Sequence, residues 1–151
     1  MKEMPSPGLP RRLAAMTYDT LLILPFIMVN VGLATLLQLS VSGQSAGDYS
    51  NTLHPQVVQA IAVVTVAIFY IYFWCKKGQT LGMQAWRIRL TDTGGGIISF
   101  KQALGRLLGA AVSLAIAGAG FWWCLFDRNG RYWHDYWSDS ELELLPKREK
   151  S

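Results

Sequence analysis

Asp19 is the residue whose type and position could do the most chemistry, because it is the single charge between Leu13 and Leu39. An ionisable side chain inside a membrane segment costs roughly 2.5–3.5 kcal/mol or more, so it is a candidate functional site by default. Arg12 lies seven positions earlier, on the same helical face and about 10.5 Å away along the axis. That separation is long for direct contact, so a second partner for Asp19 is expected. The candidates are Arg106 and His134.

Two interpretations of Asp19 stay open. The functional one is that its carboxylate binds a cation or a proton during transport. The structural one, which we favour, is an ion pair that holds the first helix against a later segment. Asp135 also has two interpretations, because it follows His134 in a run of tyrosines and tryptophans. It could belong to a proton relay, since histidine titrates near neutrality, or it could cap or pair within a helix at the headgroup level. We favour the second.

Other chemistry is poorly supported. Cys75 and Cys124 both lie in apolar runs and are interpreted as small apolar fillers. The two histidines, His54 and His134, are far apart, and no spacing resembles a zinc site. The chain also lacks a phosphate-binding glycine loop and a nucleophile elbow. We therefore predict a protein that is not an enzyme and that holds no metal or cofactor.

The distribution of charge indicates what must position these residues. All 14 Lys and Arg residues lie in three blocks, at 2–12, 76–106 and 128–150, and the formal net charge is +4. No Lys or Arg lies between 13 and 75 or between 107 and 127. Because the charges flank apolar runs, they indicate membrane topology rather than a nucleic-acid surface or a soluble domain.

Two apolar runs predict membrane-spanning helices. The first, at 9–39, contains Pro25, which should bend the helix without breaking it. The second, at 57–75, ends in aromatic residues and is followed by two lysines, as is typical of a membrane interface. The loop between the runs has no Lys or Arg, so the positive-inside rule predicts a cytoplasmic N-terminus. The expected location is the plasma (inner) membrane.

The third apolar segment, at 102–126, is ambiguous. Its uncharged part is just long enough to cross once, but a single crossing would place the basic tail outside. The alternative is a broken helix that bends near Gly118-Ala119-Gly120 and re-enters, with both ends cytoplasmic. We slightly favour the bent form. Gly105 and Gly109 form a small-xxx-small step that could let another helix pack closely.

The cytoplasmic parts, at 76–101 and 127–151, predict a small sheet. Residues 86–90 alternate with period two and are followed by a glycine-rich turn and then Ile97–Phe100, which is a hairpin pattern. The tail at 141–144 also alternates, and its glutamates could face Arg87 and Arg89 across the strands. Before this sheet, Gln79 and Leu81 flank Thr80, which is the expected cap of a helix start.

These residues together resemble the RDD family of membrane proteins, which is named for one arginine and two aspartates. The resemblance covers about residues 9–145, nearly the whole chain. It rests on the following residues: Pro10 to Ala15 before Tyr18-Asp19, the stretch Gly78, Gln79, Thr80, Leu81, Gly82 and Met83, Arg87 to Leu90, Arg106, Phe126 to Arg128, and Trp133 to Asp135.

The resemblance implies that Arg12, Asp19 and Asp135 are the three family residues. Family members commonly follow the second aspartate with a small, glycine-containing turn, a threonine and a final strand. Here residues 136–140 stand at that place without glycine, which leaves the geometry of the tail open. The family's molecular role is largely undefined: some members have been linked to sodium/proton antiport, and others act as modules of larger membrane assemblies.

The combined prediction is a single mainly α membrane domain over 1–151, with a lipid bilayer around it. We expect a membrane-protein partner or a homo-oligomer and no nucleic acid. The favoured function is a non-enzymatic accessory or scaffold component of a transport-type assembly. The alternative is a small oligomeric cation antiporter that uses Asp19.

Overall fold

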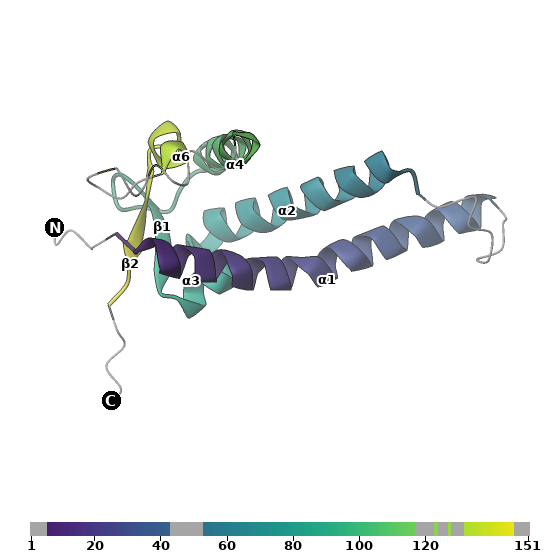
Figure 1. Ribbon diagram of the computed structural model, residues 1–151, viewed down its shortest axis with the longest axis horizontal. Coiled ribbons are helices and arrows are strands. Elements are labelled where there is room, and N and C mark those ends of the chain that lie inside the picture. The colour runs from purple at the N-terminus through teal and green to yellow at the C-terminus, as the bar shows by residue number, and fades with distance from the viewer. Residues whose placement is uncertain (1–5, 43–52, 117–122, 124–126, 128–131, 147–151) are drawn as a thin grey trace, which may run out of the picture. The chain divides into compact units, whose positions relative to one another are not determined.

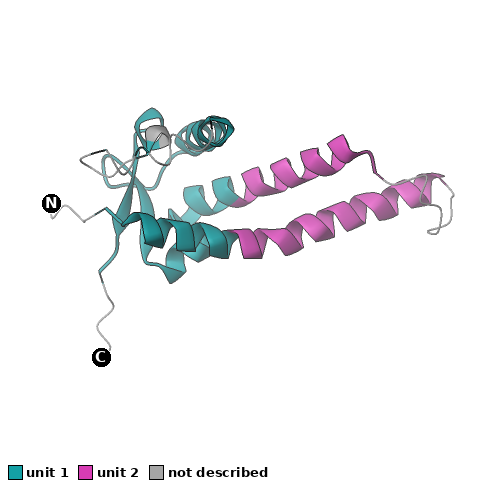
Figure 2. Ribbon diagram, viewed as in Figure 1, with its two compact units in different colours: residues 1–19, 70–151 teal, residues 20–69 magenta. Residues whose placement is uncertain are grey.

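The computed structural model describes residues 6–42, 53–116, 123, 127 and 132–146. Over these residues the chain is mainly helical, with one antiparallel pair of strands (Figure 1). The chain forms two compact units, unit 1 (residues 1–19 and 70–151) and unit 2 (residues 20–69) (Figure 2). In chain order the elements are α1 (Leu9–Ser42), α2 (Pro55–Lys77), α3 (Leu81–Ala85), β1 (Ile88–Asp92), α4 (Phe100–Ala115), α6 (Trp133–Trp137) and β2 (Ser140–Leu144).

The long apolar helices α1 and α2 are present as predicted. They contain 34 and 23 residues, which corresponds to lengths of about 51 and 35 Å. Helix α1 continues through Pro25, so the proline does not break it. Within the described residues these are the two helices long and apolar enough to cross a membrane.

Unit 2 contains the C-terminal part of α1 and the N-terminal part of α2, and it carries large apolar side chains on its surface. Met28 is 73% exposed, and Leu37 and Ile68 are also among its many exposed apolar residues. The side-chain amide of Asn30 donates to Thr65 Oγ1 at 3.3 Å, which is a polar link inside this unit. Long helices with outward apolar side chains suit a lipid environment better than water, so they point to a membrane protein.

The turn after α2 explains why glycine is needed at position 78. Gly78 has a φ of +65°, a left-handed conformation that glycine adopts without steric cost. Its N–H bonds to Trp74 O at 3.0 Å and closes the last turn of α2, while its carbonyl accepts from Leu90 N at 2.7 Å. A Cβ at this position would lie 2.6 Å from Leu90 O. Gly78 therefore both ends α2 and bonds to β1.

The strands β1 and β2 pair in an antiparallel register that places Arg89 opposite Glu143. The predicted meeting of 86–90 with the tail is therefore confirmed for this charge pair. Ile88 and Leu90 are buried, and Leu142 packs against the same cluster. The core of unit 1 joins this sheet to the helices through these buried residues: Ala15, Trp74, Met83, Ile88, Leu90, Ile98 and Ala103.

The predicted hairpin with Ile97–Phe100 is wrong. Asp92 closes the glycine loop, since its N–H donates to Gly96 O at 3.0 Å and its Oδ1 accepts from Gly96 N at 2.7 Å. Ser99 then caps α4 in a capping box with Gln102. The segment 97–99 therefore leads into α4, which begins at Phe100, and β1 pairs with the tail.

Arg87 also differs from the prediction that it faces a glutamate. Its φ is +58°, outside the strand region, and it lies between the C-cap residue Trp86 of α3 and β1. Its carbonyl accepts from Leu145 N at 2.8 Å. The turn at Arg87 follows α3 directly, so β1 begins at Ile88, two residues later than predicted.

Helix α4 covers the first part of the third apolar segment and has 16 residues. It begins two residues before the predicted start of that segment, because Ser99 provides the cap. The predicted bend at Gly118-Ala119-Gly120 lies outside the described residues. The choice between crossing and re-entering at 117–126 lies there as well, apart from Trp123.

Candidate functional site

Asp19 is buried in unit 1, where it meets the start of α3. Its side chain is 2% exposed. Thr80 Oγ1 donates to Asp19 Oδ2 at 2.6 Å, and Gly82 N donates to Asp19 Oδ1 at 2.8 Å. Thr80 Oγ1 also accepts from Met83 N at 3.1 Å, which confirms Thr80 as the cap of α3. The carboxylate therefore satisfies N–H and hydroxyl groups at a helix start, where negative charge is favoured.

Gly82 makes this close approach possible. A Cβ at this position would lie 2.3 Å from Ala15 O and 2.8 Å from Asp19 Oδ1. Any side chain would therefore push α3 away from α1 and lengthen the bonds to the carboxylate. Gln79 supports the same turn from the other side, since its Nε2 donates to Ile88 O at 2.7 Å.

The expected partners of Asp19 were Arg106 and His134, and the structure gives a different arrangement. The hydrogen bonds to Asp19 come from Thr80 and Gly82, both at the start of α3. Arg106 is bonded to Asp135 instead. The side chain of His134 lies outside what the structure describes. The difference arises because a backbone turn supplies donors that are not visible as charges in the sequence.

Arg106 forms the second polar cluster of unit 1. Its side chain is buried on α4, and its Nη1 makes an ion pair with Asp135 Oδ1 and donates to Ser140 Oγ at 2.9 Å. Ser138 Oγ lies 2.7 Å from Ser140 Oγ. The guanidinium carbon is 5.5 Å from the centre of the Trp74 ring, within cation–π range. One charge thus links α4, α6, β2 and the end of α2.

Asp135 pairs with Arg106 and binds the backbone just before α6. Its Oδ2 accepts from Tyr132 N at 2.8 Å while its Oδ1 binds Arg106. The side chain is 1% exposed. A buried charge of this kind is tolerated because it is paired and hydrogen-bonded.

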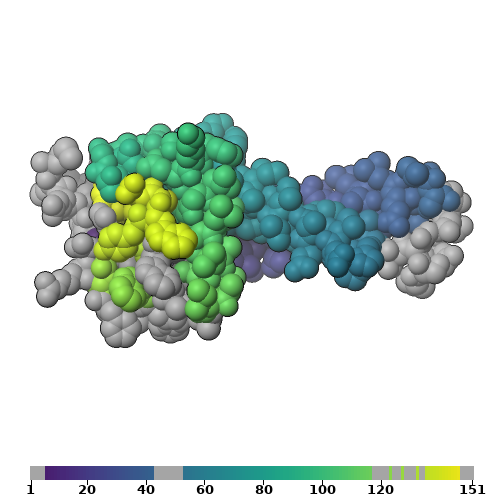
Figure 3. Space-filling model, turned by 90° about the horizontal axis from the view of Figure 1, so that it is seen from above, coloured from purple at the N-terminus to yellow at the C-terminus, as the bar shows by residue number. Residues whose placement is uncertain are grey.

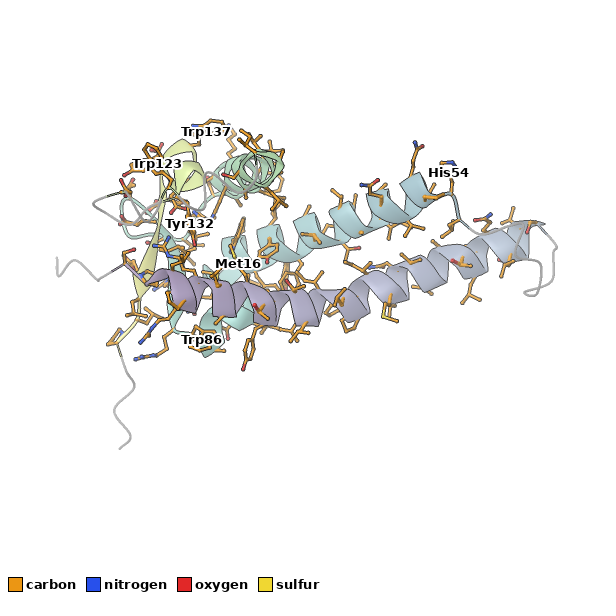
Figure 4. The ribbon with its side chains drawn as sticks, viewed as in Figure 1. Met16, His54, Trp86, Trp123, Tyr132 and Trp137 are labelled. Atoms are coloured by element: carbon orange, nitrogen blue, oxygen red, sulfur yellow. The ribbon has the colours of Figure 1, made fainter. Side chains whose placement is uncertain are left out.

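Arg12 is fixed at the start of α1 and is 4% exposed. Its Nε donates to Pro7 O at 2.8 Å and its Nη2 to Ser6 Oγ at 2.7 Å. Its guanidinium carbon lies 4.5 Å from the centre of the Tyr132 ring, and Tyr132 lies beside the first turns of α1 in Figure 4. Since Tyr132 N–H also donates to Asp135, this tyrosine connects Arg12 with Asp135.

The three family residues therefore lie in unit 1, but they do not share one ligand set. Arg12 and Asp135 are joined through Tyr132, and Asp135 also pairs with Arg106. Asp19, on α1, accepts its hydrogen bonds from the start of α3. Each connects segments that are distant in sequence. Within the described part of the chain, no group of three or more His, Cys, Asp or Glu side chains gathers that could hold a metal ion.

The turn between α6 and β2 resolves the geometry of the tail. Asp139 has a φ of +44° and occupies the left-handed conformation that a glycine would adopt easily; aspartate also tolerates it. The turn places Ser140 Oγ within hydrogen-bond distance of Arg106 Nη1.

Four residues that take part in these clusters were not predicted: Tyr132, Trp74, Ser138 and Ser140. For Ser140 the sequence carries a weak signal, because Ser138 and Ser140 are two apart at the start of an alternating strand. Tyr132 and Trp74 look like any other interfacial aromatic residue.

The comparisons with known proteins give one match. The model of the RDD family matches residues 6–139, a range that contains Arg12, Asp19 and Asp135. Comparison with the curated proteins and with the solved structures found no match. The matched range covers most of the chain, and with the two apolar helices it points to a membrane protein. The chain belongs to the RDD family.

Proposed function

We propose that this chain is a non-enzymatic accessory or scaffold component of a transport-type membrane assembly. The observation that carries the proposal is that the family residues are used to join parts of unit 1. Asp19 holds the start of α3, Asp135 holds Arg106, and Arg12 packs on Tyr132. Residues committed to internal contacts stabilise a shape, and a stable shape is what a scaffold requires.

The proposed setting is the plasma (inner) membrane, with the N-terminus in the cytoplasm. Exposed apolar residues along α1 and α2 support contact with lipid or with other membrane helices. The basic residues at 2–12 and 76–106 support the orientation. The expected partner is another membrane protein or a second copy of this chain, and we propose no nucleic acid, metal or cofactor.

A second candidate function is a small oligomeric sodium/proton-type antiporter. The observation that favours it is the environment of Asp19, whose hydrogen-bond donors are an uncharged hydroxyl and an uncharged backbone N–H. A buried carboxylate with such donors can exchange a proton for a monovalent cation if a path for ions reaches it. Two spanning helices are too few to enclose such a path, so this function needs an oligomer.

Ion-driven proton flux in proteoliposomes separates the two functions. Pulses of Na⁺, Li⁺ or K⁺ are applied to the native protein, to Asp19→Asn and to the matched control Asp92→Asn, a carboxylate at the end of β1 that accepts from Gly96 N. The accessory function predicts no flux from any of the three. Flux that persists in Asp92→Asn and vanishes in Asp19→Asn would overturn it in favour of the antiporter.

The same protein is also followed in native membranes. The accessory function predicts that the chain migrates in a complex with a second protein at fixed stoichiometry, and that crosslinking joins the two. A chain that is found alone or only as a homo-oligomer, and that shows flux, would contradict it.

A further inference from the structure

Helix α4 has the reverse of the polarity expected for a helix on a protein surface in water. Its buried residues are small or polar: Ala103, Arg106, Gly109 and Ser113. Its outward face carries large apolar side chains at four-residue spacing: Phe100, Leu104, Leu108 and Val112, all exposed. Leu108, in the middle of this row, is 59% exposed. A helix normally turns its apolar stripe inward when water surrounds it, so the medium outside α4 should be apolar.

The pairing of the strands restricts where α4 can lie. Strand β1 precedes α4, strand β2 follows it, and the two form one sheet. Because strands cannot pair across a bilayer, both ends of the segment between them must be on the same side of the membrane. The 16 residues of α4 reach about 24 Å, which is less than the hydrocarbon core of about 30 Å.

The surroundings of α4 resemble a membrane interface. Trp137 is 68% exposed and Trp123 is 45% exposed, and both lie on the side of unit 1 that carries α4 (Figure 4). Lys101 is exposed in the first turn of α4, where its ammonium can reach lipid phosphates while its stem stays apolar. Tryptophan and lysine in such positions are typical anchors at the headgroup level.

The direction of α4 within unit 1 agrees with this position. Figure 2 shows α4 almost end-on, whereas the part of α1 in unit 1 runs along the page, so the two helices cross steeply. Figure 3 shows α4 uncovered at the surface of unit 1. A helix that crosses the first turns of a spanning helix steeply lies closer to the membrane plane than to its normal.

We propose that α4 is an interfacial helix that lies along the cytoplasmic surface of the bilayer. Its row Phe100, Leu104, Leu108 and Val112 is buried at the boundary between headgroups and acyl chains, and lipid is its partner. Arg106 faces the protein and, through Asp135 and Ser140, ties this lipid-bound helix to α6 and β2. The proposal is independent of whether the protein is an accessory component or an antiporter.

Depth measurements with spin labels test the proposal. Single cysteines at Leu104, Leu108 and Val112 are introduced into a chain with Cys75→Ala and Cys124→Ala, and the full protein is reconstituted in vesicles of phosphatidylethanolamine and phosphatidylglycerol. Labels at Val63 on α2 and Thr93 in the loop after β1, both exposed, serve as the deep reference and the aqueous reference.

The expected result is one shallow depth for all three α4 labels. Oxygen should collide with these labels and enhance their relaxation strongly, and an aqueous nickel chelate should do so only weakly. Leu104 and Val112 are separated by about 12 Å along the axis, so a helix that inserts steeply would show a depth that changes by a similar amount. That gradient would overturn the proposal. α4 labels that are as accessible to the nickel chelate as the label at Thr93 would overturn it too. So would α4 labels that a protein partner shields from both oxygen and the nickel chelate.

Discussion

Gly82 and Gly105 show how differently two helical glycines are used in this chain. Gly82 lies where α3 touches α1, and a Cβ there would lie 2.3 Å from Ala15 O. Gly105 lies on α4, and nothing is within 4 Å of the place where its Cβ would be. The first glycine permits the contacts of Asp19, and the second is replaceable as far as the packing of this chain is concerned.

We expect Gly82→Ala to destabilise the protein by about 1–3 kcal/mol, the usual cost of overpacking. The reason is that α3 must move away from α1 and loosen the bonds to Asp19. Gly105→Ala is the matched control, and it should keep or raise stability because alanine favours a helix by about 0.8–1.0 kcal/mol over glycine. Thermal unfolding of both variants in detergent, followed by tryptophan fluorescence, measures the difference. Equal midpoints for the two variants would contradict the close approach.

At the level of elements, long-range polar contacts join parts of unit 1 in addition to its apolar core. Arg106 and Asp135 join α4 to α6, and Ser140 extends the same cluster to β2. Both charged side chains are almost fully buried. A buried pair of this kind is costly to break from one side, because the remaining charge is left without compensation.

We therefore expect Asp135→Ala to cost about 3–5 kcal/mol of stability. The double variant Arg106→Met with Asp135→Leu should cost clearly less than Asp135→Ala, because no buried charge remains. Unfolding midpoints of the single and double variants provide the test, and circular dichroism checks that each is folded. The stability lost in the double variant is compared with the sum of the losses in Arg106→Met and Asp135→Leu alone. If the two values were equal, the two side chains would not be energetically coupled.

At the scale of the whole molecule, the sheet joins two parts of the chain that are far apart in the sequence. The loop after α2 contributes β1, and the tail contributes β2. In the membrane setting that we propose, this pairing would keep both ends of the segment between the strands on one side, which agrees with the basic residues at both ends.

This arrangement predicts the sidedness of three single cysteines, at Thr93, Pro146 and Val41. All three positions are exposed, and the first two lie beside β1 and β2. In oriented membrane vesicles a membrane-impermeant maleimide should label Thr93→Cys and Pro146→Cys from the same, cytoplasmic face. Val41→Cys, near the far end of α1, should react from the opposite face. Labelling of Thr93→Cys and Pro146→Cys from opposite faces would mean that β1 and β2 do not pair in the membrane.

The sequence by itself determined what depends on contiguous residues. The two apolar runs became α1 and α2, because helix formation and transfer to an apolar medium are properties of a continuous stretch. The cap at Thr80 and the alternation before Leu90 were readable for the same reason.

Only the tertiary structure decided which distant residues meet. Asp19 accepts hydrogen bonds from Thr80 and Gly82 and does not pair with Arg106. Arg106 binds Asp135 and Ser140. Ile97–Phe100 was predicted as a strand, but Ser99 caps α4, which begins at Phe100, and the tail pairs with β1 instead. These outcomes depend on hydrogen bonds between segments that are far apart in the chain. Some of the donors are backbone N–H groups, which nearly every residue has, so spacing and charge alone could not identify the partners.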